Sequence, residues 1–293
     1  MAKKEKEYEK TERVFTDDIN ALKGERLPTL LPNWLIKEGV QPNAEIINAE
    51  RIGSKDSQNK TDIIVRLKDS NPIKLSVKML NADYYGNWYG HKRIIELFGE
   101  KGFKKLTIAS TEWANNIKDD PKWSEKPFIG VSLCFGKRSG RTKIEFKKLF
   151  PEDEILLLVR GEKPQAEDKT ANALLIGNSD ITINNTQDLI DHIQEITIDN
   201  VLNEIGYFNI IFRPINPKTE GTNRGKNIYT KFVPYKPLDQ PTVIKNMTEL
   251  APLGTFKTVE PQLGSPKLTH NYWLKQLKEK YNIIIPPKPK KKK

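Results

Sequence analysis

Residues 60–78 read KTDIIVRLKDSNPIKLSVK, and this stretch decides the expected fold. Two apolar, β-branched runs flank a turn that contains a proline, which is typical of two short strands joined by a hairpin. Asp62 opens the first strand, and Ser76 and Lys78 lie two residues apart on the second, so their side chains share a face. The hairpin would return that face toward Asp62. An acid, a lysine and a third polar group on one sheet surface could hold a divalent metal and activate a water.

The length and charge of the chain limit the number of domains and the kind of partner that we expect. With 293 residues the chain can form one large domain or two smaller ones, each with a buried core. Its apolar residues cluster in strand-like runs, so we expect disorder only at the ends. The net charge of +11 fits a polyanionic partner, and a basic protein with no such partner is the alternative. Five of these charges come from the tail residues Lys288, Lys290, Lys291, Lys292 and Lys293.

The composition argues against several classes of protein. Cys134 is the single cysteine and lies in an apolar run, which excludes an internal disulfide framework and a cysteine-rich zinc site. Residues 2–13 are dense in Lys and Glu, unlike a secretory signal, and no apolar run has transmembrane length. The three histidines are scattered, and no Walker loop, GxGxxG turn or G-x-S-x-G elbow is present. We therefore expect a cytoplasmic protein without a membrane partner.

The first 110 residues predict an α/β core with a mixed sheet. A charged arm at 1–13, either a frayed helix or a disordered segment, comes first. The expected elements that follow are a helix at 14–24, a helical turn within 27–36, a strand at 44–52, the hairpin, a helix at 92–97 that ends at Gly99, and a strand at 104–109. The main order is helix, three strands, helix and strand.

The chain becomes richer in strands from residue 128. Strands are expected at 128–135, 143–146, 154–159, 173–176, 207–213 and 227–232, the last two as a pair, and helices at 188–196 and 270–281. We therefore divide the chain into the arm, a core at 14–127, a β-rich half at 128–285 and a basic tail at 286–293. The β-rich half could belong to the same domain as the core.

The opening stretch resembles the PD-(D/E)XK nuclease family, in particular type II restriction endonucleases. In that family an Asp at the start of one core strand and a (D/E)-X-K motif on the next strand bind the metal. Asp62 matches the first acid, with Thr61 in place of the usual proline, and Ser76-Val77-Lys78 has serine where the family has an acid. Similar Ser-X-Lys motifs occur in a subset of these nucleases, followed by a glycine-rich stretch with a histidine, as Gly90-His91 follows here.

The resemblance covers about residues 14–110 and implies a restriction-endonuclease-like core that hydrolyses DNA with Mg²⁺. Asp62 would be the metal ligand, Lys78 would place its ammonium beside the attacking water or the phosphate, and Ser76 could offer only a hydroxyl. Another acid must then replace the missing carboxylate. The family often draws a glutamate from the preceding helix, which favours Glu25. The other candidate glutamates before Asp62 are Glu38, Glu45 and Glu50.

Candidate DNA contacts lie in an aromatic run and in two basic loops. His91 could position a phosphate, and Tyr85 and Trp88 could stack on bases; a packing histidine and a small aromatic core are the alternatives. The basic loops could clamp phosphates or read guanine, or could be merely solvated. Their candidate residues are Lys137, Arg138 and Arg141 in one loop, and Arg224 and Lys226 in the other.

The sequence thus favours a Mg²⁺-dependent endonuclease of double-stranded DNA whose β-rich half reads the target. A homodimer would match a palindromic target. One alternative is a non-catalytic DNA- or RNA-binding protein that uses the same basic surface. Another is an assembly protein whose tails bind a partner. In either case Asp62 and Lys78 would only keep the edge of the hairpin soluble.

Overall fold

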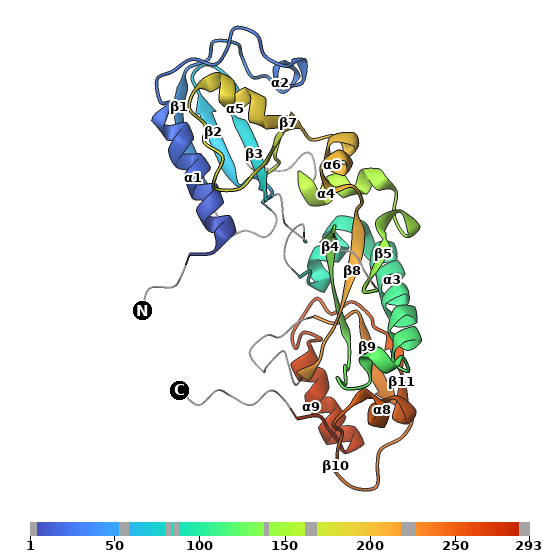
Figure 1. The fold of residues 1–293 in the computed structure, drawn as a ribbon. Coiled ribbons are helices and arrows are strands. Elements are labelled where there is room, and N and C mark those ends of the chain that lie inside the picture. The colour runs from blue at the N-terminus through green and yellow to red at the C-terminus, as the bar shows by residue number, and fades with distance from the viewer. Residues whose placement is uncertain are drawn as a thin grey trace. The chain divides into compact units, whose positions relative to one another are not determined.

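The protein has a mixed α/β fold that divides into two compact units, shown as a computed structural model in Figure 1. Unit 1 comprises Met1–Tyr85 and Pro151–Phe208, and unit 2 comprises Gly86–Phe150 and Asn209–Lys293. The boundary expected at 127/128 falls inside unit 2, and each unit combines two separate pieces of chain. The described residues are 5–52, 59–79, 84, 88–137, 141–161, 169–217 and 227–286.

Unit 1 is built on a mixed sheet with the strand order β1-β2-β3-β6-β7. The hairpin expected within 60–78 is confirmed, with Ile63 opposite Leu75. Strands β1 to β3 form an antiparallel meander, β6 runs parallel to β3, and β7 is antiparallel to β6. The strands are β1 (Ile46–Arg51), β2 (Ile63–Leu67), β3 (Ile73–Lys78), β6 (Ala173–Ile176) and β7 (Ile193–Glu195).

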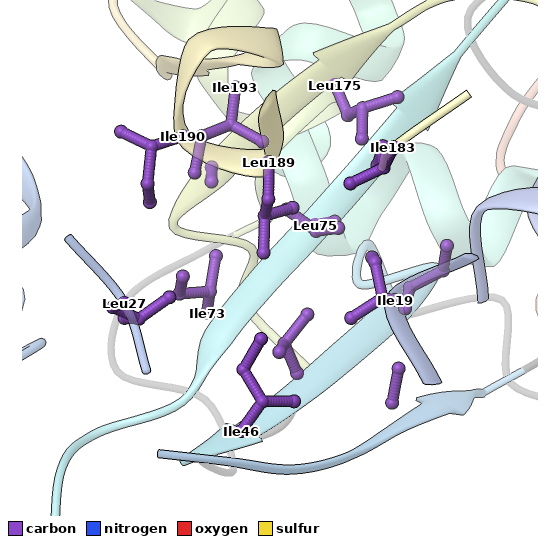
Figure 2. Packing of buried hydrophobic residues seen from close by; sticks show 14 of the residues in the cluster. Ile19, Leu27, Ile46, Ile73, Leu75, Leu175, Ile183, Leu189, Ile190 and Ile193 are labelled. Carbon is purple, nitrogen blue, oxygen red and sulfur yellow. The ribbon is translucent and has the colours of Figure 1, made fainter. Parts of the chain in front are cut away.

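Helices flank both faces of this sheet. Side chains of α1 and α5, such as Ile19 and Leu189, join Leu75 of β3 in one buried cluster (Figure 2). Ser76 points to the opposite face, where its hydroxyl donates to the Val159 carbonyl at the end of α4. The helices of unit 1 are α1 (Glu7–Ala21), α2 (Asn33–Lys37), α4 (Ile155–Val159), α5 (Thr186–His192) and α6 (Ile198–Ile205), with the 3₁₀ turn η3 (Glu152–Glu154) before α4.

Two expectations about unit 1 are wrong. Helix α1 begins at Glu7 rather than near 14, because Thr11, Phe15 and Ile19 bury one continuous face at helical spacing. The apolar run expected as a strand at 154–159 is mostly the helix α4, since a short apolar run does not distinguish the two. The order expected within residues 14–110 holds only as far as β3, because the helix at 92–97 and the strand at 104–109 both fall inside one helix of unit 2, and the sheet of unit 1 is continued instead by β6, which follows the inserted residues 86–150.

Unit 2 contains a three-stranded sheet of order β4-β8-β5 and the antiparallel ribbon β9–β11. Its long helices are α3 (His91–Ile117) and α9 (His270–Tyr281). The strands are β4 (Val131–Gly136), β5 (Lys143–Glu145), β8 (Asn209–Pro214), β9 (Thr230–Pro234) and β11 (Gly254–Thr258), with the short parallel pair β10 (Thr242–Val243) and β12 (Ile283–Ile284). The short helices are η1 (Pro121–Trp123), η2 (Phe146–Lys148), α8 (Met247–Leu250) and η4 (Ala251–Leu253).

The helix expected at 270–281 is confirmed, but the expected strand at 104–109 lies inside α3. The helix continues past Gly99, where the backbone φ of 65° produces a kink, because Phe103, Leu106 and Trp113 are buried beyond it. Strands β8 and β9 do not pair: β8 lies between β4 and β5, and β9 pairs with β11. Within the described ranges, no helix is both long and apolar enough to cross a membrane.

Candidate active site

Asp62 and Lys78 meet at one end of the unit 1 sheet, where β2 begins and β3 ends. The Asp62 amide donates to the Leu75 carbonyl at 2.8 Å, which fixes the start of β2 against β3. Asp62 Oδ2 accepts from the Val77 amide at 2.7 Å and from Lys78 Nζ at 3.3 Å. Lys78 Nζ also donates to the Val77 carbonyl at 3.0 Å. Both side chains are half-buried, with exposed fractions of 29% for Asp62 and 18% for Lys78.

A second acid, Glu12 of α1, belongs to the same end of the sheet. Its Oε2 accepts from Arg51 Nε at 2.7 Å. Arg51 ends β1 and lies opposite Ile63, the residue after Asp62. Glu12 is only 14% exposed. Burial raises the pKa of Glu12, the Arg51 hydrogen bond opposes this rise, and the Asp62 charge adds to it. Glu12 is therefore within electrostatic reach of the predicted pair.

Glu25 is not the acid beside Asp62. Its carbonyl accepts from the Ile46 amide at 2.9 Å, at the start of β1, whereas Arg51 and Asp62 lie where β1 ends. The intervening strand is about 16 Å long at about 3.3 Å per residue. Glu25 therefore lies at the opposite end of the sheet from Asp62. The glutamate at the same end as Asp62 is Glu12.

Ser76 lies on the face of β3 that packs against α4. It is fully buried, and its Oγ donates to the Val159 carbonyl at 3.2 Å. The serine in place of the family's acid has a physical reason, because a carboxylate under α4 would lose its hydration without a cation to replace it. The Ser76 hydroxyl therefore has a protein partner, which favours a structural role, and its expected contact with a metal stays a prediction.

Two carboxylates at this end of the sheet could hold a metal ion. Asp62 Oδ1 and Glu12 Oε1 make no hydrogen bond to the described part of the chain, so each acid presents one open oxygen. No group of three or more His, Cys, Asp or Glu suited to a metal occurs among the residues that the structure describes. Mg²⁺ is commonly held by one or two carboxylates and keeps several waters, whereas zinc takes His and Cys. The donor set fits Mg²⁺.

His91 is buried in unit 2, which favours the packing alternative over a contact with DNA. It is 2% exposed. Its Nδ1 accepts from the Gln262 amide at 3.0 Å, so Nε2 carries the proton and donates to the Ile228 carbonyl at 2.9 Å. Phe103 and Tyr229 pack edge-on against the ring. Burial lowers the pKa of His91, and the bond to the carbonyl of Ile228 opposes this.

Three of the other predicted DNA contacts, Trp88, Lys137 and Arg141, lie among the described residues. Trp88 packs under the guanidinium of Arg213, whose central carbon is 5.1 Å from the ring centre. Arg141 forms an ion pair with Asp120. Lys137 follows β4 and is half-buried. Tyr85, Arg138, Arg224 and Lys226 lie outside the described residues.

Sequence reasoning missed Glu12 and Arg51. The signal for Glu12 was present, since Thr11, Phe15 and Ile19 repeat at helical spacing and extend the helix through the charged arm. The position of Arg51 depends on strand register, which the sequence does not give. Comparison of the chain with protein-family models, with curated proteins and with solved structures found no match. The geometry of the site is therefore the basis for a functional proposal.

Proposed function

We propose that this chain is a Mg²⁺-dependent endonuclease that hydrolyses double-stranded DNA, with a PD-(D/E)XK-type site. The observation that carries the proposal is the ion pair of Asp62 and Lys78 at one end of a mixed sheet, with Glu12 held by Arg51 at the same end. The mixed sheet flanked by helices supports it, because a restriction-endonuclease-like core is expected to have such a sheet.

Each residue has a chemical role in this proposal. Asp62 and Glu12 would hold Mg²⁺ through Oδ1 and Oε1, and the bound ion would polarise the phosphate and lower the pKa of a water. Lys78 is anchored by Asp62 and by the Val77 carbonyl, so its ammonium would stabilise negative charge beside the attacking water. Arg51 would act as a positioning residue that fixes the Glu12 carboxylate.

The form of nuclease that we propose is a sequence-specific type II restriction enzyme. A homodimer would place two such sites on the two strands of a palindromic target. Unit 2 would then supply contacts to the duplex, because the acids of the proposed site all belong to unit 1.

A plasmid digest tests the proposal. The protein should cut plasmid DNA into discrete fragments with Mg²⁺ and leave it intact with EDTA. Asp62→Asn and Lys78→Ala should each lower the cleavage rate by about 10²-fold or more, the size of effect typical for a lost charge-stabilising group. Lys68→Ala and Asp69→Asn are matched controls, because they lie in the turn at the other end of the same hairpin. Full activity in either site variant would overturn the assignment.

A non-catalytic nucleic-acid-binding protein is the second candidate. Asp62 Oδ2 accepts hydrogen bonds from both the Val77 amide and Lys78 Nζ, as the acid of a purely structural ion pair would. Such a structural role for Asp62 and Lys78 favours a protein without catalytic activity. A gel shift of the plasmid without cleavage in Mg²⁺ or Mn²⁺ would favour this function over the nuclease.

A further inference from the structure

The β9–β11 ribbon of unit 2 brings like charges together. Lys231 of β9 and Lys257 of β11 lie directly opposite each other in the antiparallel register, so their side chains project from the same face of the ribbon. The neighbouring pair Phe232 and Phe256 faces the other way and is buried. The lysine pair therefore lies on the face away from that aromatic core.

Helix α9 adds a third lysine and an aromatic anchor. Lys231 Nζ lies 4.6 Å from the ring centre of Trp273, which is buried and donates from Nε1 to the Phe232 carbonyl at 2.7 Å. Lys280 follows Trp273 by seven residues, which is two helical turns, so both lie on one face of α9. Burial lowers the pKa of Lys231, and the charges of Lys280 and Lys257 lower it further.

No acid of the described part of the chain forms an ion pair with these lysines. In the described ranges, neither Lys231, Lys257 nor Lys280 forms an ion pair with a carboxylate, whereas Lys275 of the same helix lies 3.7 Å from Glu279. Like charges directly opposite each other on a sheet are destabilising. The free protein therefore retains a local repulsion that a bound anion would relieve.

We propose that Lys231, Lys257 and Lys280 form a phosphate-binding site for the backbone of duplex DNA, with Trp273 holding Lys231 in position. Lysine is a compact point charge that neutralises phosphate without reading bases, so this contact would be independent of sequence. Lys257 and Lys280 are exposed, which leaves them open to a polymer that runs across the surface. The inference rests on the proposed function in taking DNA as the ligand.

The test measures DNA binding without cleavage. A labelled 30-base-pair duplex is titrated in EDTA, at several salt concentrations, with the wild-type protein and with a Lys231→Gln, Lys257→Gln, Lys280→Gln variant. We expect at least a tenfold loss of affinity and a salt slope smaller by about two to three, since each neutralised phosphate contributes about 0.9. The matched control replaces three exposed lysines elsewhere in unit 2, Lys101, Lys126 and Lys148, by Gln. Equal affinity and slope in the two variants would overturn the site.

A single variant separates binding from stability. Lys257→Glu creates an opposite-charge pair across the ribbon with Lys231, so its melting temperature should equal or exceed that of the wild type while its DNA affinity falls. A melting temperature well below the wild type would show that Lys257 is a structural residue and would count against the site. Unchanged DNA affinity would also count against it.

The two proposals fail in different ways. If the wild-type protein binds the duplex but never cuts plasmid, the nuclease proposal fails and the affinity comparison still decides the lysine site. If the wild type cuts and both triple variants bind alike, only the lysine site fails. A wild-type protein that binds no DNA overturns both. Loss of binding to anionic vesicles in the lysine variant, with DNA binding retained, would assign the surface to a membrane and overturn this proposal.

Discussion

At the scale of single residues, the site depends on which glutamate accompanies Asp62. Glu12 and Glu25 lie on opposite ends of the same sheet, so equivalent changes at the two positions should have different effects. We expect Glu12→Gln to lower the cleavage rate by about 10²-fold and to raise the Mg²⁺ concentration needed, because a carboxylate ligand is lost. Glu25→Gln should cut like the wild type. Plasmid cleavage over a Mg²⁺ titration measures the rate and the Mg²⁺ requirement of both variants. Slow cleavage by Glu25→Gln with normal cleavage by Glu12→Gln would identify Glu25 as the ligand instead.

The raised pKa of Glu12 also predicts a pH dependence. Its folded-state pKa lies above the ordinary value of 4.5, so the folded protein holds a proton that the unfolded chain releases. The stability that this group contributes is complete below pH 4.5 and is lost as pH rises through the raised pKa. The stability of the wild type relative to Glu12→Gln should therefore fall with rising pH, measured by denaturant unfolding between pH 4 and 7. A difference that grows with pH would contradict the assignment.

His91 predicts the opposite pH dependence of stability, because its pKa is lowered rather than raised. Its folded-state pKa lies below 6.5, so the unfolded chain binds a proton more readily than the folded protein. The free energy of unfolding therefore decreases as pH falls below about 6.5. His91→Gln should reduce this acid sensitivity and cost about 1–3 kcal/mol at pH 7, because buried partners lose hydrogen bonds. Unfolding at pH 5 and pH 7 measures both effects. Weaker DNA binding by the folded variant would instead return His91 to the DNA contacts.

At the scale of elements, alternate residues of β3 pack against helices on the two faces of the unit 1 sheet. Ile73, Leu75 and Val77 point into the cluster shared with α1 and α5, while Ser76 points to α4. Lys74 and Lys78 are the half-exposed residues of β3, and Lys78 is the one at the end beside Asp62. This placement favours a structural role for Ser76, whereas Lys78 lies at the end of the strand beside Asp62.

Substitutions at Ser76 test this division. We expect Ser76→Ala to cut like the wild type and to lose about 1 kcal/mol of stability with the hydrogen bond to Val159. Ser76→Asp would restore the family's acid but should destabilise the fold by several kcal/mol, because a buried carboxylate lacks a cation. Thermal unfolding and plasmid cleavage measure the two effects. A stable, more active Ser76→Asp variant would show that this position faces the metal.

At the scale of the whole molecule, each unit is assembled from distant pieces of chain. Strand β6 joins β3 in parallel, with Leu75 opposite Ala173, although the whole first piece of unit 2 separates them in sequence. The sheet that presents Asp62 and Lys78 is therefore complete only when both pieces of unit 1 are present. The proposed chemistry belongs to unit 1, and the proposed lysine contact belongs to unit 2.

The basic tail provides a test at this scale. Removing residues 287–293 takes away Lys288, Lys290, Lys291, Lys292 and Lys293. We expect weaker DNA binding with a smaller salt slope, since fewer counterions are released, and an unchanged pattern of plasmid fragments. Anisotropy titrations and a digest measure the two properties. A changed fragment pattern would show that the tail helps to select the target.

The sequence by itself determined the local elements with strong patterns: the hairpin at 60–78, the strand at 173–176 and the helix at 270–281. It also placed Asp62 and Lys78 on adjacent strands, because hairpin register follows from a short turn and alternating burial. The strand expected at 104–109 was wrong, since burial along α3 overrides the local preference.

Only the tertiary structure decided which acid stands near Asp62, which strand runs beside β3, and which lysines lie together in unit 2. Glu12 and Arg51 are far apart in sequence, as are Lys231 and Lys257. Such contacts depend on helix docking and strand register between distant segments, and local propensity carries no information about either. Local patterns therefore predicted some of the elements and the pair Asp62 and Lys78, whereas the contacts of Glu12 and Arg51 required long-range packing.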